Sequence, residues 1–77
     1  MKVEILSPDK LIFAGEVDSI QVPGKDGSLG ILNNHAPLVA SLKAGKVVLR
    51  TGGSEESFDL NGGVVEVNRN KVIILSD

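Results

Sequence analysis

The chain lacks several of the residues on which protein chemistry most often depends. Its 77 residues include no cysteine, no tryptophan and no tyrosine, with one histidine and two phenylalanines. Without cysteine, disulfides cannot crosslink the fold and thiolate metal sites are excluded. A single imidazole leaves little for acid–base or nucleophilic chemistry, and zinc needs three or four clustered ligands. We therefore expect a protein that is not an enzyme and that binds no metal and no cofactor.

Long apolar runs and an excess of positive charge are also missing. No apolar run approaches the roughly 20 residues of a membrane-spanning helix. The N-terminal residues 1–4, Met-Lys-Val-Glu, do not resemble a signal peptide. The formal net charge of −2 argues against a nucleic-acid partner, because phosphate binding requires an excess of lysine and arginine. We expect a soluble protein that contacts a membrane only through a partner.

What the chain does contain is short apolar segments with a period of two. Val3 and Ile5 alternate with Lys2 and Glu4, as on the two faces of a strand. Most intervals between glycine and proline residues are too short for an average helix. The segment 38–42 fits either a strand or a helical turn. The other predicted strands cover residues 2–5, 11–14 (ended or bulged at Gly15), 20–22, 46–51, 57–61, 64–67 and 72–75. The pattern predicts one all-β domain over residues 1–77, a sandwich or a small barrel.

Residues 23–37 are unlike the rest of the chain. Pro23-Gly24 and Asp26-Gly27 are turn dipeptides, which predict that the backbone reverses twice within a few residues. Gly30 stands among large apolar residues, where its missing Cβ allows another group to come close. The segment also carries the only histidine, His35. We interpret it as a loop that holds a defined shape and serves as a docking surface.

Catalytic and phosphate-binding interpretations of this segment are weaker. Asp26 is the one acidic residue that could approach His35 across the loop, but no Gly-x-Ser-x-Gly turn accompanies the pair. The glycines at 24, 27 and 30 are not followed by the Gly-Lys-Ser/Thr of a phosphate loop. A lone histidine in a small domain is more often a structural or interface residue, and we favour that role.

Several motifs give the chain a resemblance to a known family, the epsilon subunit of the rotary F-type ATP synthase. The resemblance spans essentially the whole chain, and its most specific block is Leu-Gly-Ile-Leu at 29–32 followed by His-Ala-Pro-Leu at 35–38. The other matching motifs occur in the same order at residues 15–17, 22–27, 42–45, 62–67 and 72–77.

The resemblance implies an antiparallel β-sandwich of about ten short strands. It also implies a non-catalytic rotor subunit in the central stalk, on the cytoplasmic face of the bacterial inner membrane. There the family connects the gamma subunit to the ring of c subunits, so that rotation is coupled to ATP synthesis. Carried over by position, the residues expected to face gamma are Ser7, His35, Leu38 and Ala40, and those expected to face the c-ring are Asp26, Gly27, Ser28 and Leu29.

The chain departs from the family pattern in two places. Family members usually continue past the position of Asp77 into two C-terminal helices, so the inhibition and ATP binding associated with those helices are not implied here, and we expect no helical domain in this chain. Many members also have glutamate where this chain has Ser28, which removes an ion pair with the ring; we hypothesise that Asp26 takes over part of that role.

An alternative from another class is a biotinyl- or lipoyl-carrier domain, which is also small and all-β. Such domains present a modified lysine at a hairpin tip, within Met-Lys-Met or Asp-Lys-Ala. Neither triplet occurs, and Lys71, beside Asn70 at a predicted turn, is the nearest candidate. An oligonucleotide-binding barrel is a third alternative, but it needs basic and aromatic strands that the chain lacks.

Overall fold

The chain folds entirely into strands and turns. A computed structural model describes residues 1–77. It contains nine strands and no helix, which confirms the all-β prediction. Residues 38–42 form a strand, not a helical turn. No segment forms a helix with the length and hydrophobicity needed to cross a membrane. The strands are β1 (Lys2–Ser7), β2 (Lys10–Glu16), β3 (Ser19–Gly24), β4 (Gly27–Leu32), β5 (Leu38–Leu42), β6 (Gly45–Thr51), β7 (Ser54–Leu60), β8 (Gly63–Asn68) and β9 (Lys71–Ser76).

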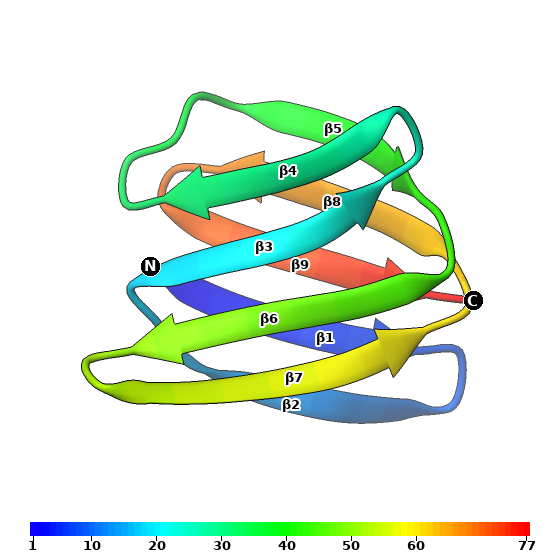
Figure 1. The fold of residues 1–77 in the computed structure, drawn as a ribbon, viewed down its shortest axis with the longest axis horizontal. Coiled ribbons are helices and arrows are strands. Elements are labelled where there is room, and N and C mark those ends of the chain that lie inside the picture. Colours follow the sequence, from blue (N-terminus) through cyan, green and yellow to red (C-terminus); the bar gives the residue numbers. More distant parts are fainter.

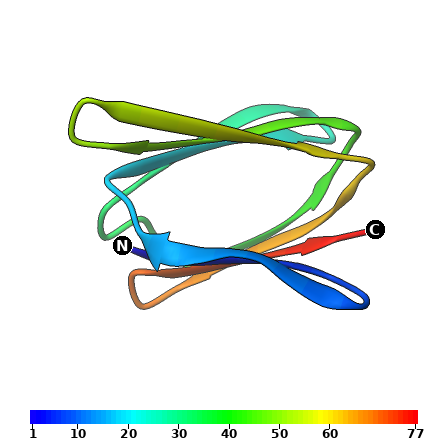
Figure 2. The ribbon, with the colours of Figure 1, turned by 90° about the horizontal axis from the view of Figure 1, so that it is seen from below.

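The strands form one sheet that folds over into two layers (Figures 1 and 2). One layer has the order β2-β1-β9-β8-β5, and the other has the order β4-β3-β6-β7. The layers are joined where Gly24 of β3 pairs with Leu42 of β5. All strand pairs are antiparallel except β1 and β9, which run parallel at the centre of the first layer. The first and last strands of the chain thus lie side by side in the same direction, and the two termini lie at opposite ends of this pair (Figure 1).

The core follows the alternation that was visible in the sequence. Fifteen buried apolar residues form one cluster, and no polar or charged residue is buried. Val3 and Ile5 of β1 are fully buried, as are Val72 and Ile74 of β9 beside them. Burying these side chains removes apolar surface from water, the main stabilising contribution in a domain this small. β9 is central in its layer, as its apolar sequence predicts.

Two predictions about local structure were wrong. Strand β2 does not end or bulge at Gly15 but continues to Glu16. Its irregularity lies earlier, at Ile12, which is skipped in the pairing because Ile5 and Leu6 of β1 face Phe13 and Leu11. The second error concerns Pro23-Gly24, which does not form a turn. The backbone reverses only once, at Lys25-Asp26, and β3 pairs with β4 on either side of it.

Pro23 is compatible with a strand because of the direction in which its backbone points. It lies opposite Ser28 on β4, and its carbonyl oxygen accepts a hydrogen bond from the Lys43 N–H at 2.9 Å, on the side away from β4. The missing N–H of proline therefore removes no bond between β3 and β4. As a result, residues 23–37 contain the strand β4 and are not one irregular loop.

Candidate functional site

The largest recess in the structure is a groove of about 440 Å³ between the β3–β4 hairpin and β5. It is lined by residues 24–29 and 38–41. β4 is the outer strand of one layer and β5 that of the other, and they are not hydrogen-bonded to each other. The groove is therefore the place where the edges of the two layers separate.

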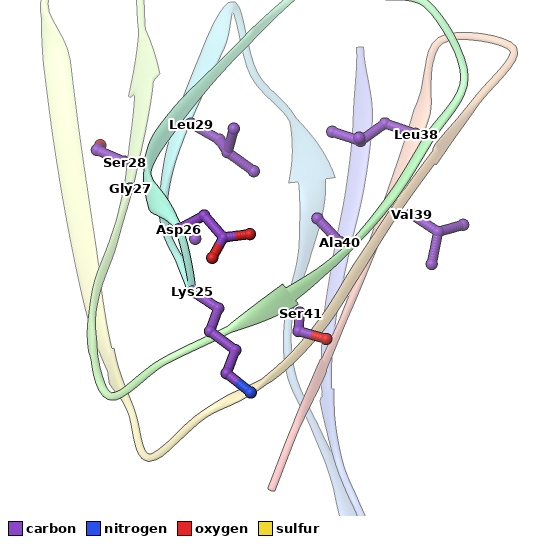
Figure 3. A pocket seen from close by; sticks show the side chains of 10 residues that line it. Lys25, Asp26, Gly27, Ser28, Leu29, Leu38, Val39, Ala40 and Ser41 are labelled. Atoms are coloured by element: carbon purple, nitrogen blue, oxygen red, sulfur yellow. The ribbon is translucent and has the colours of Figure 1, made fainter.

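The bottom of the groove is apolar and its hairpin end is polar. Figure 3 shows Leu29 and Leu38 directed into the space between the strands, with Lys25 and Asp26 at the hairpin turn. Leu29, Leu38 and Ala40 are half-buried and pack against the main core. The hairpin end contains one positive and one negative side chain, so it carries no net charge. This lining suits an apolar or uncharged segment better than a charged ligand.

The groove brings together six of the eight residues singled out in the sequence. They comprise all four residues assigned to the ring and two of those assigned to gamma: Asp26, Gly27, Ser28, Leu29, Leu38 and Ala40. The two sets of residues therefore line one continuous groove. The sequence analysis missed Gly24, Lys25, Val39 and Ser41 as lining residues. Val39 and Ser41 could have been found from the sequence if residues 38–42 had been interpreted as an edge strand, because they alternate with Leu38 and Ala40.

His35 lies outside the groove, in the connection between β4 and β5. Its ring Nδ1 is 2.7 Å from the Ala36 carbonyl oxygen, and its backbone N–H donates to the Leu32 carbonyl oxygen at 3.2 Å. The structure does not bring Asp26 to His35, because β4 separates the two along its whole length, about 20 Å for six residues. No three histidine, cysteine or acidic side chains come together in a group that could hold a metal ion.

Ser7 is separated from the other residues assigned to gamma. It lies at the β1–β2 turn, where its hydroxyl donates to Asp9 Oδ1 at 3.0 Å. Two strands, β9 and β8, lie between β1 and β5 in the layer, so Ser7 is roughly 14 Å or more from the strand that carries Leu38. The structure therefore places Ser7 apart from the groove.

The connection from β4 to β5 is fixed by contacts with distant residues. The α-ammonium group of Met1 donates to Asn33 Oδ1 at 2.6 Å and to the Val17 carbonyl oxygen at 2.9 Å. The Asn34 N–H donates to Asn70 Oδ1 at 2.8 Å. Asn34 has a φ of 63°, a conformation that asparagine tolerates better than most residues. These bonds hold the connection, and with it His35, in one position.

Comparison with known proteins relates this fold to a described family. Residues 1–77 match the family described as the beta-sandwich domain of the ATP synthase Delta/Epsilon chain. The chain belongs to this family. The resemblance inferred from the sequence motifs is thus confirmed, and the family description agrees with the two-layered structure.

Bacterial relatives in this family carry the description ATP synthase epsilon chain. The protein from Chlorobium limicola is 49% identical over 77 residues, which cover 99% of this chain and 88% of the relative. That from Leptospira interrogans serovar Lai is 47% identical over 77 residues, which cover all of this chain and 61% of the relative. The chain thus spans about three fifths of the length of several relatives that it matches.

Solved structures with the same fold are chains of mitochondrial ATP synthases. A chain of the Euglena gracilis enzyme, in a structure of OSCP, F1 and the c-ring, has a TM-score of 0.90 at 26% identity. The likeness covers 96% of this chain and 48% of that chain. A chain from the central stalk and c-ring of the Tetrahymena thermophila enzyme has a TM-score of 0.83 at 22% identity, covering 97% and 61%, and shows the fold alone.

Proposed function

We propose that this chain is a non-catalytic rotor element of an F-type ATP synthase that connects the gamma subunit to the c-ring and so couples rotation to ATP synthesis. Membership of the Delta/Epsilon family and bacterial relatives described as epsilon chains support this proposal. The same relatives support a place on the cytoplasmic face of the bacterial inner membrane, with membrane contact through the complex. Family membership favours this function over the carrier-domain alternative.

The observation that carries the proposal is the groove between β4 and β5. It gathers residues that the family resemblance assigns to partner contacts, whereas the only histidine lies outside it, with its ring next to the Ala36 carbonyl oxygen. A groove with an apolar bottom and a neutral end is suited to holding another polypeptide. It supports a role in docking and offers no group arranged for acid–base chemistry.

The polarity of the groove supports a division between the two partners. Asp26, Gly27 and Ser28 form the exposed, polar hairpin end, which would meet the polar loops of the ring. Leu38 and Ala40 lie at the apolar side, close in sequence to His35, and would meet gamma. Because both sets line one groove, the two partners would dock side by side.

The test is a pull-down of the purified chain with the gamma subunit of the same organism, followed by the same experiment with the assembled ring. We expect capture of gamma alone, and stronger capture of ring and gamma together. Failure to capture gamma at any concentration would contradict the proposal.

The contribution of Asp26 can be tested in the same assay. Asp26→Lys should weaken binding to the ring several-fold at low salt, because it reverses a charge at the polar hairpin end, and the loss should shrink as salt rises. Ser28→Lys, at the start of β4 next to the turn, is the control and should have a smaller effect. Equal losses from both changes would show that Asp26 does not replace the acidic residue.

A further inference from the structure

Three strands have one side that pairs with no other strand, and they differ in how that side is protected; β5 pairs on its outer side at Leu42 alone. β2 and β7 are the two ends of the sheet, and β4 pairs only with β3. β7 carries Glu55, Glu56 and Asp59, and β2 carries Lys10 and Glu16 beside an irregular register. Charges and irregularities of this kind prevent the addition of another strand. β4, with the sequence Gly-Ser-Leu-Gly-Ile-Leu, has no charged residue, no proline and a regular register.

The register shows which backbone groups of β4 are free. Gly24 and Gly27 pair directly across the two-residue turn, so that pair is hydrogen-bonded and the next pair, Pro23 and Ser28, is not. The Pro23 carbonyl oxygen accepts a hydrogen bond from the Lys43 N–H, which confirms that the backbone groups of Pro23 point away from β4. By alternation, Ser28 and Gly30 direct both N–H and C=O away from β3, along the free edge of β4; Ser28 lines the groove, and Gly30 lies just beyond its lining.

No other strand of the chain pairs with these groups, because β4 pairs only with β3. The face of the strand at Gly30 is open as well: a Cβ there would meet no atom within 4 Å, so no part of the chain makes the close approach that the sequence predicted at this glycine. On the far side of the groove, β5 uses its Ser41 carbonyl oxygen to accept from the Lys25 N–H at 2.9 Å. Beyond that bond the two edges separate, and Leu32 and Val39 are exposed at the open end, at 65% and 70%.

We propose that an extended segment of the gamma subunit enters the groove and adds as a strand to the free edge of β4. The inference rests on the proposed function and specifies how the partner is held. Ser28 and Gly30 would exchange main-chain hydrogen bonds with the segment, and every second side chain of the segment would cover Leu29, Leu38 and Ala40. We take gamma as the occupant because Leu38 and Ala40, which the resemblance assigns to gamma, form the β5 wall of the groove. The inference thereby moves the Ser28 backbone and Leu29 from the ring contact to the gamma contact, and leaves the side chains of the hairpin end to the ring.

The charge of the groove fits this occupant. Its only charged lining residues, Lys25 and Asp26, cancel, so the edge offers main-chain bonds and apolar contacts without an ionic component. Binding through β4 should therefore change little with salt, unlike the contact expected of Asp26 with the ring. A second copy of this chain is the competing occupant, since two unprotected β4 edges could pair with each other.

Amide hydrogen exchange measured by NMR, with and without the gamma subunit, tests the inference directly. In the free chain the Ser28 and Gly30 amides should exchange fast and those of Leu29 and Ile31 slowly, because only the latter bond to β3. With gamma bound, Ser28 and Gly30 should become as slow as their neighbours. Binding of gamma that leaves them fast would overturn strand addition while leaving the proposed function intact.

Substitutions by proline provide the second test. Ser28→Pro removes an N–H directed at the groove without removing a bond to β3, and should lower gamma affinity about tenfold or more. Ser28→Ala controls for the hydroxyl, which accepts from Gln21 Nε2 at 2.9 Å, and should change affinity by less than about threefold. Ser57→Pro is the matched change on the free side of β7 and should leave affinity unchanged.

The remaining outcomes are also decisive. Equal affinity for Ser28→Pro and wild type, with equal melting temperatures, would overturn the inference. A dimer of the free chain in sedimentation that Ser28→Pro abolishes would identify a second copy as the occupant and overturn the assignment to gamma. Absence of gamma binding in the wild type would instead contradict the proposed function. Should Ser28→Pro fold poorly, the exchange measurement on the wild-type chain still decides.

Discussion

The sandwich has two long sides where the edges of its layers meet, and they are closed to different degrees. On one side β2 faces β7, and Phe13 and Phe58 pack together with ring centroids 5.5 Å apart at an angle of 53°. On the other side β4 faces β5, and the small or aliphatic Leu29, Leu38 and Ala40 leave the 440 Å³ groove. Both aromatic residues of the chain are thus used to close one side.

The comparison indicates that the closed side contributes mainly to stability and the open side mainly to binding. The side closed by the phenylalanines buries large apolar surface within the chain, and its outer strands carry protective charges. The open side leaves apolar surface and backbone groups available to a partner. Substitutions should therefore affect mainly stability on the closed side and mainly binding on the open side.

The largest effect is expected from Phe58→Ala on the closed side. Loss of the half-buried ring should lower the free energy of unfolding by about 2 kcal/mol, less than for a fully buried phenylalanine. Urea unfolding measures the loss, and gamma affinity should be unchanged. In a double-mutant cycle, Phe13 and Phe58 should be coupled by about 0.5–1.5 kcal/mol. A coupling near zero would show that the ring pair does not close this side.

Asn33→Ala should have the next largest effect, because it removes the acceptor for the Met1 ammonium group. We expect a loss of about 1–2 kcal/mol in the free energy of unfolding, the range for a hydrogen bond to a charged group. Asn33→Asp keeps an acceptor oxygen and serves as the control in the same urea titration. If Asn33→Ala and Asn33→Asp lower the free energy of unfolding equally, the contact with the Met1 ammonium group does not hold the β4–β5 connection in place.

Leu38→Ala is the counterpart of Phe58→Ala on the open side. It should cost about 1 kcal/mol of stability, since the side chain is only half-buried, but should lower gamma affinity about tenfold. Calorimetric titration with gamma and urea unfolding measure the two effects. A large stability loss with unchanged gamma affinity would remove the distinction between the two sides.

His35→Asp is expected to have the smallest effect on stability. The substitution keeps the backbone bond to Leu32 and changes only a partly exposed ring, so the melting temperature should change little. It places a charge at the contact assigned to gamma and should lower gamma affinity. His35→Gln, which adds no charge, is the control. A fall in melting temperature that matches the loss of binding would mean that His35 is only structural.

Much of the fold could be predicted from local patterns. Alternation identified the strands around Val3, Ile20 and Val65, and the Asn-rich turn before Lys71 was located correctly. Strand β4 was missed because Pro23-Gly24 resembles a turn, and only the partner strand shows that Pro23 can lie in a ladder. The parallel pairing of β1 and β9 was also missed, since pairing between distant strands leaves no local signal.

Most residues of the candidate site were predicted from the sequence, but their spatial arrangement was not. Asp26 to Leu29, Leu38 and Ala40 were named, and they do share one groove. Ser7 lies apart from it, and the suggested approach of Asp26 to His35 is not made. Positional resemblance supplies which residues matter, but the distances among them depend on how the sheet folds over.

The amino-acid sequence determined that this protein is all-β and which residues form its core, because a period of two in apolar residues is a property of neighbouring positions. Which side of the sandwich is closed and which is open was decided only by the tertiary structure. That outcome depends on Phe13 meeting Phe58 across two layers, and on β5 pairing with β3 at Gly24 and Leu42 alone, which leaves the outer side of β4 unpaired. Such contacts join residues far apart in the chain, so no local pattern encodes them.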